Sequence, residues 1–315
     1  MIATRKPLLP KSSPGPFVIQ GPPKDDTAEK YILTIVDLYE KLSKLPKLDP
    51  SPEVNSIFGK LVSVCAETPS EAIAEKVITD LRIVKITPHL RQLCSDGECR
   101  LEAYWAEKIG HFKLESQVNK ALLEFPYYSN YVDLTKMELY ALFSMSPVKP
   151  RSFAFIGSGP LPLTSLCIAD IINKEASSSG APIRIHNIDR DQQAISLSSS
   201  LCQKLGRRAR SLTFQCTEAV EERSRQDLKA FDVVYLAALV GSTKAQKQEI
   251  ISDVAGRMRP GAFLVLRSAH SLRSLLYPII DAATDLRNSN LEPLLAVHPY
   301  NHIVNSVIIA RVTAA

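Results

Sequence analysis

The first half of the chain has hydrophobic positions spaced as in helices. Apolar residues recur there at steps of three and four, as in Ile35, Leu38 and Leu42. This spacing is typical of helices that bury one face against a core. Residues 27–150 are therefore predicted to form an all-α domain of about five to seven helices. The longest is expected to run from about Thr87 to Phe112.

At Ser152 this pattern changes, and short apolar segments begin to alternate with segments of helical spacing. The expected strands are Phe153–Ile156, Ile183–Asn187, Ser211–Cys216, Val233–Ala238, Ala262–Arg267, Leu291–Val297 and Ile303–Ala310. The expected helices between them begin near Leu163, Asp191, Ala219, Lys244 and Ser271. Such alternation predicts an α/β fold with a doubly wound, mostly parallel, seven-stranded sheet. Because the last two strands are joined by a hairpin-like turn, residues 151–315 are predicted to form a methyltransferase-like Rossmann domain.

The first 26 residues differ from both halves. They contain six of the 21 prolines and no apolar periodicity, which predicts a disordered tail. Arg5, Lys6, Lys11 and Lys24 account for most of the formal net charge of +5, because the first 24 residues contain no acid. The rest of the chain is nearly neutral and has no run that interleaves basic and aromatic residues. No nucleic-acid partner is therefore expected.

Several sequence features that mark other classes of protein are missing. The chain has no apolar segment long enough to cross a bilayer and no apolar signal core, so a soluble, cytoplasmic protein without a membrane partner is expected. None of the six cysteines forms a C-x-x-C pair, as is typical of buried thiols in a reducing compartment. Pro299 lies between His298 and His302 and disfavours a helical pair of metal ligands, so no metal site is expected.

The end of the first expected strand has the features of a nucleotide site. Gly157 and Gly159 flank one residue, which allows a tight turn and a close approach of the backbone to a ligand. The helix that follows would direct its N-terminal amides at that ligand. Asp189 ends the second strand, where an acid can accept hydrogen bonds from both ribose hydroxyls. Asp189 could alternatively be the N-cap of the next helix, but Asp191 is better placed for that role.

Two further strand ends complete this predicted site. Thr217 and Glu218 follow the third strand, beside the expected adenine edge, although Glu218 could equally open the next helix. Small residues end the fourth strand and leave room for a ligand. The predicted cofactor-binding residues are Gly157, Ser158, Gly159, Pro160, Leu161, Asp189, Thr217, Glu218, Ala237, Ala238 and Leu239. From these residues we expect a nucleoside-bearing cofactor, S-adenosylmethionine in preference to NAD.

Five segments together resemble the nicotianamine synthase family. They are E-F-P-Y-Y-S-N-Y at 124–131, A-F-I-G-S-G-P-L-P-L-T-S at 154–165, F-D-V-V with L-A-A-L-V-G at 231–241, L-R-S-A-H at 266–270 with Y-P at 277–278, and H-P at 298–299 with V-N-S-V at 304–307. The resemblance extends over about residues 28–311. The N-I-D-R-D string at 187–191 and the absence of the usual aspartate after Thr217 depart from plant members and are typical of a fungal-type member.

The resemblance implies an activity. The family joins three S-adenosylmethionine molecules as substrate, each contributing a 3-amino-3-carboxypropyl group, and releases 5′-methylthioadenosine. The product, nicotianamine, chelates transition metals. An amine attacks the γ-carbon beside the sulfonium, so the enzyme must choose that carbon and deprotonate the attacking ammonium. No metal is required for this chemistry.

The resemblance also implies site residues. It places Glu102 and Tyr131 in the reaction chamber as catalytic residues, with Glu102 the base and Glu98, one helical turn earlier, the alternative. Tyr128, Arg267 and Glu98 are the expected substrate-binding residues. The competing interpretations are a solvated helix acid for Glu102, a core aromatic for Tyr128 and a structural ion-pair partner for Arg267.

Other functions remain compatible with the same pattern. An ordinary small-molecule methyltransferase would release S-adenosylhomocysteine in place of methylthioadenosine. A related enzyme of an opine-metallophore pathway would make a single transfer to an amino acid such as histidine. A degenerate domain could bind S-adenosylmethionine and act only as a scaffold. The number and order of transfers and the oligomeric state are not encoded in any motif of the chain.

Overall fold

The computed structural model describes residues 25–175, 182–217, 227–240, 244–287 and 289–314. The tail predicted for residues 1–26 falls almost entirely outside these described residues, as does Glu218. Among the helices described, none is long and apolar enough to cross a membrane.

Among the described residues, six helices precede the first strand, within the predicted range of five to seven. They are α1 (Asp25–Ser43), α2 (Pro52–Ala66), α3 (Glu71–Thr79), α4 (Leu81–Gly110), α5 (Glu115–Leu123) and α6 (Tyr128–Met145). The longest helix, α4, begins earlier than expected. Its N-cap is Asp80, whose side chain accepts a hydrogen bond from the Arg82 amide, and the helix then continues through Pro88. Proline is best tolerated in the first turn of a helix. The presence of Pro88 therefore led to a predicted helix start near Thr87, whereas α4 begins at Leu81.

The second half forms one seven-stranded sheet, and the predicted fold class is confirmed. The strands are β1 (Ser152–Ile156), β2 (Arg184–Asp189), β3 (Leu212–Cys216), β4 (Val233–Leu236), β5 (Phe263–Ser268), β6 (Leu291–Val297) and β7 (Ser306–Val312). Their order is β3-β2-β1-β4-β5-β7-β6, and β7 is antiparallel to both of its neighbours. Because β1 to β5 are parallel, their carboxyl ends lie at one edge, where ligands bind in open α/β sheets.

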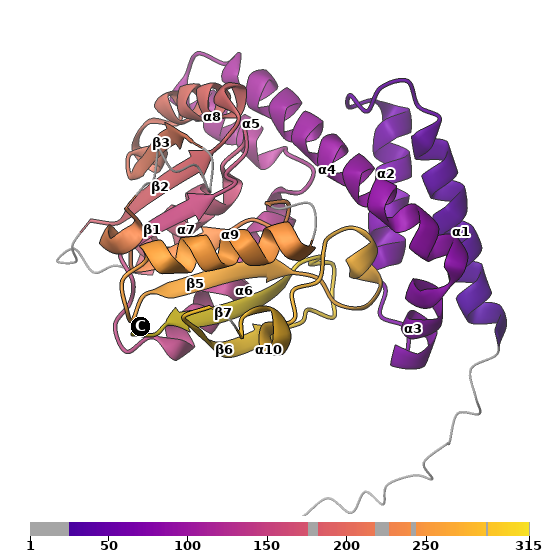
Figure 1. Cartoon of the computed structure of the whole chain (residues 1–315). Coiled ribbons are helices and arrows are strands. Elements are labelled where there is room, and N and C mark those ends of the chain that lie inside the picture. Colours follow the sequence, from indigo (N-terminus) through magenta and orange to yellow (C-terminus); the bar gives the residue numbers. More distant parts are fainter. Residues whose placement is uncertain (1–24, 176–181, 218–226, 241–243, 288, 315) are drawn as a thin grey trace, which may run out of the picture.

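Both faces of the sheet are covered by helices. Phe153 and Phe155 of β1 lie in a hydrophobic core with α6, α7 (Leu163–Glu175) and α8 (Gln192–Lys204). Ala154 and Ile156 of the same strand lie in a second core with α9 (Lys244–Arg257). This alternation along one strand is the period of two expected for a strand buried on both sides. Figure 1 shows α9 crossing the near face of the sheet.

A third core connects the first helices to the sheet half. Residues of α1 to α4 pack there against Leu272, Leu275 and Leu276, which follow β5. In Figure 1, α4 runs from this helical bundle to the side of the sheet where α5 and α8 lie. The last turns of α4, with α5 and α6, contribute to the core of the sheet itself. The domain limit near residue 150 stays a prediction, and the cores cross that limit.

Two expected elements near the end of the chain also differ in the structure. The last strand begins at Ser306 and not at Ile303, because the buried guanidinium of Arg273 takes the backbone carbonyls of Asn301 and Ile303. The helix expected from Ser271 is only a 3₁₀ segment, Ser271–Leu275, followed later by α10 (Ala282–Asp285). The helix expected near Ala219 lies outside the described residues.

Candidate functional site

The glycine turn after β1 has the backbone conformation that its sequence predicts. Gly157 and Gly159 have φ angles of +79° and +67°, which only glycine adopts without strain. A Cβ atom at Gly157 would lie 2.4 Å from Val240 Cγ2 and 3.1 Å from Ala237 Cβ. The turn after β1 therefore packs directly against the end of β4. This close approach requires glycine, and it brings the two strand ends together at the expected edge.

Asp189, at the end of β2, faces this turn. Its Oδ2 atom accepts a hydrogen bond of 2.8 Å from the Gly159 amide, and its Oδ1 atom accepts one of 3.0 Å from the Asp191 amide. A carboxylate can accept about four hydrogen bonds, so capacity remains for ribose hydroxyls. Asp191 is the N-cap of α8, as predicted, and accepts a hydrogen bond from the Gln193 amide.

The other predicted cofactor residues are placed around the same edge. The Thr217 amide donates a hydrogen bond to the Asp189 carbonyl, and Thr217 is buried. Ser158 is also buried, and its hydroxyl has no partner among the described residues. Pro160 and Leu161 continue the turn, and Ala237, Ala238 and Leu239 follow β4. The structure thus brings the described candidates together, and their binding of a cofactor stays a prediction.

Replacing Asp189 with alanine is expected to weaken S-adenosylmethionine binding by about 1.5–3 kcal/mol, the range for hydrogen bonds to a charged group. The reason is the loss of the acceptor for ribose and of the bond that holds the Gly159 amide. Titration calorimetry measures the change, and a melting curve checks that the variant is folded. An unchanged affinity in a folded variant would remove Asp189 from the site.

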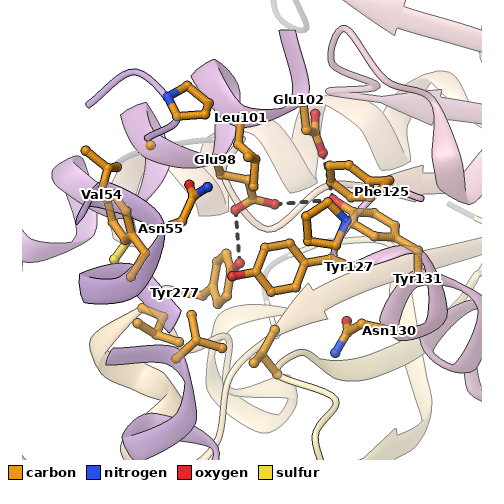
Figure 2. A pocket seen from close by; sticks show the side chains of 18 of the residues that line it. Val54, Asn55, Glu98, Leu101, Glu102, Phe125, Tyr127, Asn130, Tyr131 and Tyr277 are labelled. Carbon is orange, nitrogen blue, oxygen red and sulfur yellow. Dashed lines mark hydrogen bonds between the residues drawn. The ribbon is translucent and has the colours of Figure 1, made fainter. Parts of the chain in front are cut away.

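A cavity lies between the helical half and the sheet half. Its volume of about 230 Å³ is far larger than the space that a single water molecule needs. Helix α2 supplies Val54 and Asn55, α4 supplies Glu98 and Glu102, and Tyr277 comes from the segment after β5. Most other lining residues are apolar or aromatic. Figure 2 shows these side chains around one space, with the two glutamates close to Tyr131. The cavity therefore combines apolar walls with a few polar groups, as ligand sites do.

A chain of hydrogen bonds links the polar groups of the cavity. The Tyr131 hydroxyl donates to Glu102 Oε1 at 2.7 Å and lies 3.3 Å from Glu98 Oε1. The Tyr277 hydroxyl donates to Glu98 Oε2 at 3.0 Å (Figure 2). Glu98 and Glu102 are one turn apart on α4, so both face the cavity. One helix face thus presents two carboxyl groups that share a tyrosine.

This environment changes the acidity of the groups. Burial, followed by the nearby charge of Glu98, raises the pKa of Glu102 to about 8, against the lowering effect of the Tyr131 hydrogen bond. Burial also raises the pKa of Glu98 and of Tyr131. A carboxyl group with a pKa near neutrality can accept and release a proton at physiological pH. Glu102 therefore has the acidity expected of a general base.

The cavity meets the glycine turn at Glu102. A Cβ atom at Gly159 would lie 2.8 Å from Glu102 Oε2. Glu102 is only 9% exposed, so it is not the solvated helix acid considered from the sequence. The carboxyl group thus lies between the cavity and the glycine turn.

The structure separates two predicted substrate-binding residues from the cavity. Tyr128 does not line it, and its hydroxyl accepts a hydrogen bond of 2.7 Å from Arg208, which also pairs with Asp170. Arg267 is buried and donates to both oxygens of Glu138, at 2.7 and 3.1 Å, and to Thr164. Arg267 is thus a structural ion-pair partner in this structure. The two nearby tyrosines, Tyr127 immediately before Tyr128 and Tyr131 about one helical turn after it, line the cavity.

Sequence reasoning did not single out three residues that the structure makes important. Glu138 is fully buried beneath the site, and a signal was available, because it falls on the apolar face of α6 with Leu134 and Leu142. Tyr277 and Asn305 line the cavity. Both belong to segments that carry the family resemblance, Y-P at 277–278 and V-N-S-V at 304–307, but each lies in a loop, and no local pattern indicates where such a loop will lie.

The sheet order, the glycine turn and the buried acid in the adjoining cavity define an S-adenosylmethionine-dependent transferase. The family described as nicotianamine synthase protein matches residues 24–315. The chain belongs to this family. The expectation drawn from the five sequence segments is therefore confirmed, while the fungal-type assignment stays a prediction.

Relatives and solved structures agree with this membership. The chain is 37% identical over 277 residues to nicotianamine synthase 1 of Arabidopsis thaliana, covering 88% of this chain and 82% of that protein. It is also 37% identical over 277 residues to nicotianamine synthase of Solanum lycopersicum, with the same coverage. A glutamate-to-glutamine mutant of MtNAS in complex with S-adenosylmethionine has a TM-score of 0.72 at 16% identity, covering 90% of this chain and 98% of that chain. That likeness shows a shared fold.

No group of three or more histidine, cysteine, aspartate or glutamate side chains within the described ranges is arranged to hold a metal ion. His298, one of the two histidines considered from the sequence, stacks on His270 with ring centroids 4.3 Å apart and lies 2.9 Å from Ser306 Oγ. The ring of His298 is thus engaged within the fold.

Proposed function

We propose that this protein is a nicotianamine synthase, which joins 3-amino-3-carboxypropyl groups from three S-adenosylmethionine molecules and releases methylthioadenosine. The observation that supports this most is the hydrogen bond of 2.7 Å from the Tyr131 hydroxyl to the buried carboxyl group of Glu102, which lies directly beside the glycine turn. This arrangement supports a proton acceptor beside the glycine turn, where we expect the sulfonium substrate to bind.

The reaction follows from the groups present. The lone pair of an amine forms a bond to the γ-carbon of the bound substrate, and the bond from that carbon to sulfur breaks. Its electron pair stays on sulfur, so the sulfonium cation becomes a neutral thioether, methylthioadenosine. The proton lost by the attacking ammonium passes to the Glu102 carboxylate, and Tyr131 orients that carboxylate through its hydrogen bond.

The charge of the cavity supports the same assignment. Glu98 and Glu102 are the ionisable carboxyl groups among its lining residues, and the two species that must enter it, an ammonium and a sulfonium, are cations. Binding of transition metals by the product and a cytoplasmic location belong to the same proposal, and both rest on the expectations drawn from the sequence.

The experiment is incubation of the purified full-length protein with S-adenosylmethionine alone, followed by mass spectrometry of the products. Methylthioadenosine together with nicotianamine is the expected result. S-adenosylhomocysteine would identify a methyltransferase. Methylthioadenosine that appears only after an amino acid such as histidine is added would identify a single-transfer enzyme. Bound but unchanged S-adenosylmethionine would indicate a domain that only binds it.

A further inference from the structure

Asn305 lies at the edge of the sheet where ligands bind. It directly precedes β7, and the first residue of β7, Ser306, pairs with Ser268 at the carboxyl end of β5. Because β7 runs antiparallel, its beginning lies at the same edge as the ends of the parallel strands. Asn305 also lines the cavity that contains Glu98 and Glu102.

The side-chain amide of Asn305 is buried without a partner. The residue is 6% exposed, and its Nδ2 atom has no hydrogen-bond acceptor within the described part of the chain. A buried donor without a partner is destabilising, because the water it has lost is not replaced by another acceptor. A built cavity that contains such a donor is therefore expected to supply the acceptor from a ligand.

Four other hydrogen-bond donors that line the cavity are either engaged or open to solvent. The Tyr131 hydroxyl donates to Glu102, and the Tyr277 hydroxyl donates to Glu98. The Asn130 amide donates to the His302 carbonyl at 2.9 Å. Asn55 is exposed, so water can satisfy it. Asn305 is thus a buried donor in the cavity lining that has no partner among the described residues.

The ligand has two charged ends that must be matched. The cavity lining contains two glutamates, and none of the described residues that line it is lysine or arginine. An amino-acid group carries an ammonium, which suits Glu98 or Glu102, and a carboxylate, which neither glutamate can bind. We propose that the Asn305 amide binds the α-carboxylate of an amino-acid group in this cavity, with the ammonium directed to the glutamates.

This assignment rests on the proposed function, because that function brings amino-acid groups to the cavity. The carboxylate has two sources, the methionine half of S-adenosylmethionine and the chain that accepts the transferred group. Both present the same chemistry to Asn305. Methylthioadenosine has neither an ammonium nor a carboxylate, so it serves as an internal control for the nucleoside site.

The test uses Asn305→Leu and Asn305→Asp in the full-length protein. Leucine removes the donor at similar size, and aspartate replaces it with an anionic acceptor that repels a carboxylate. Calorimetry then measures affinity for nicotianamine, for methylthioadenosine and for S-adenosylmethionine, the last in a Glu102→Gln background to prevent turnover. We expect about 10- to 100-fold weaker nicotianamine binding with leucine, a larger loss with aspartate, and unchanged methylthioadenosine binding.

The matched control is Ser211→Ala. Ser211 Oγ is also buried without a partner among the described residues, but Ser211 does not line the cavity, so its loss should change no affinity. If only the affinity for nicotianamine falls, Asn305 binds the carboxylate of the chain that accepts the transferred group. If the affinity for S-adenosylmethionine falls as well, Asn305 binds the carboxylate of the donor. Both results support the proposal.

Three results would overturn it. The first is tighter nicotianamine binding by Asn305→Asp, which would place an ammonium beside residue 305. The second is an equal loss of affinity for methylthioadenosine. The third is unchanged affinity for all three ligands in both Asn305 variants. Activity of the wild-type protein separates the two proposals. If that protein forms methylthioadenosine and nicotianamine while the Asn305 variants bind normally, only the Asn305 assignment fails. If it forms neither product, both proposals fail.

Discussion

Replacing Glu102 with glutamine is expected to slow methylthioadenosine release by about 10²- to 10⁴-fold, the range for loss of a general base. Glutamine keeps the size of the side chain and can still accept the hydrogen bond from Tyr131. Cofactor affinity should therefore remain near that of the wild type, because the turn and Asp189 form a separate part of the site. The measurement is the rate of release under saturating S-adenosylmethionine.

The pH dependence gives this prediction a second readout. The pKa of Glu102 is raised to about 8, so the wild-type rate should rise as pH increases toward and through that value, when the carboxylate forms. The glutamine variant should lack this titration. Its deficit should also shrink at high pH, because more of the attacking amine is then already deprotonated.

Tyr131→Phe is the companion variant, since it removes the hydroxyl that orients the carboxylate. Its rate should also fall, and the pH profile should move, because the hydrogen bond from Tyr131 lowers the pKa of Glu102. Near-normal release by Glu102→Gln at neutral pH would contradict the assignment. Glu98 would then be the base to test, because it contacts the same hydroxyl and the Tyr277 hydroxyl.

The same raised pKa has a consequence for stability. A carboxyl group with a higher pKa in the folded than in the unfolded state contributes stability that is fully present below the unfolded pKa, 4.5, and is lost as pH rises through about 8. Glu102→Gln removes this loss. The variant should therefore melt no lower than the wild type at pH 8, and its melting temperature should depend less on pH between 5 and 8.

Replacing Glu138 with leucine is expected to lower the free energy of unfolding by about 3–5 kcal/mol, the cost of leaving one partner of a buried ion pair without the other. Glu138 is fully buried, and both of its carboxylate oxygens accept hydrogen bonds from Arg267. The variant would leave the guanidinium with the Thr164 hydroxyl and the face of Phe155. Urea denaturation followed by circular dichroism measures the change.

Two variants control for this result. Glu138→Leu with Arg267→Met should recover most of the loss, because apolar groups then replace both charges. Glu292→Leu breaks the ion pair between Glu292 and Arg311, whose side chains are 48% and 45% exposed, and should cost less than about 1 kcal/mol. If Glu138→Leu lowered the free energy of unfolding by no more than Glu292→Leu does, the buried pair would have little effect on stability.

The sequence alone determined the order of the elements and the sheet edge at which a cofactor is expected. Periods of three to four and of two are local properties, so they predicted about five to seven helices and then the alternating strands without knowledge of packing. Gly157, Gly159 and Asp189 were recognisable because each lies directly at a strand end, where the topology of a parallel sheet fixes its neighbours. The family resemblance added Glu102 and Tyr131, which no local pattern separates from ordinary helix residues.

Only the tertiary structure decided which residues meet in the cavity. Asn305 and Tyr277 arrive from loops, and the start of β7 depends on the Arg273 guanidinium, which takes backbone carbonyls far from it in sequence. From the sequence, Arg267 could bind a substrate carboxylate or form a structural ion pair, and its hydrogen bond to Glu138 in the structure favours the ion pair. These contacts join residues more than twenty positions apart, and the energies of burial and pairing that select them exist only once the chain is folded.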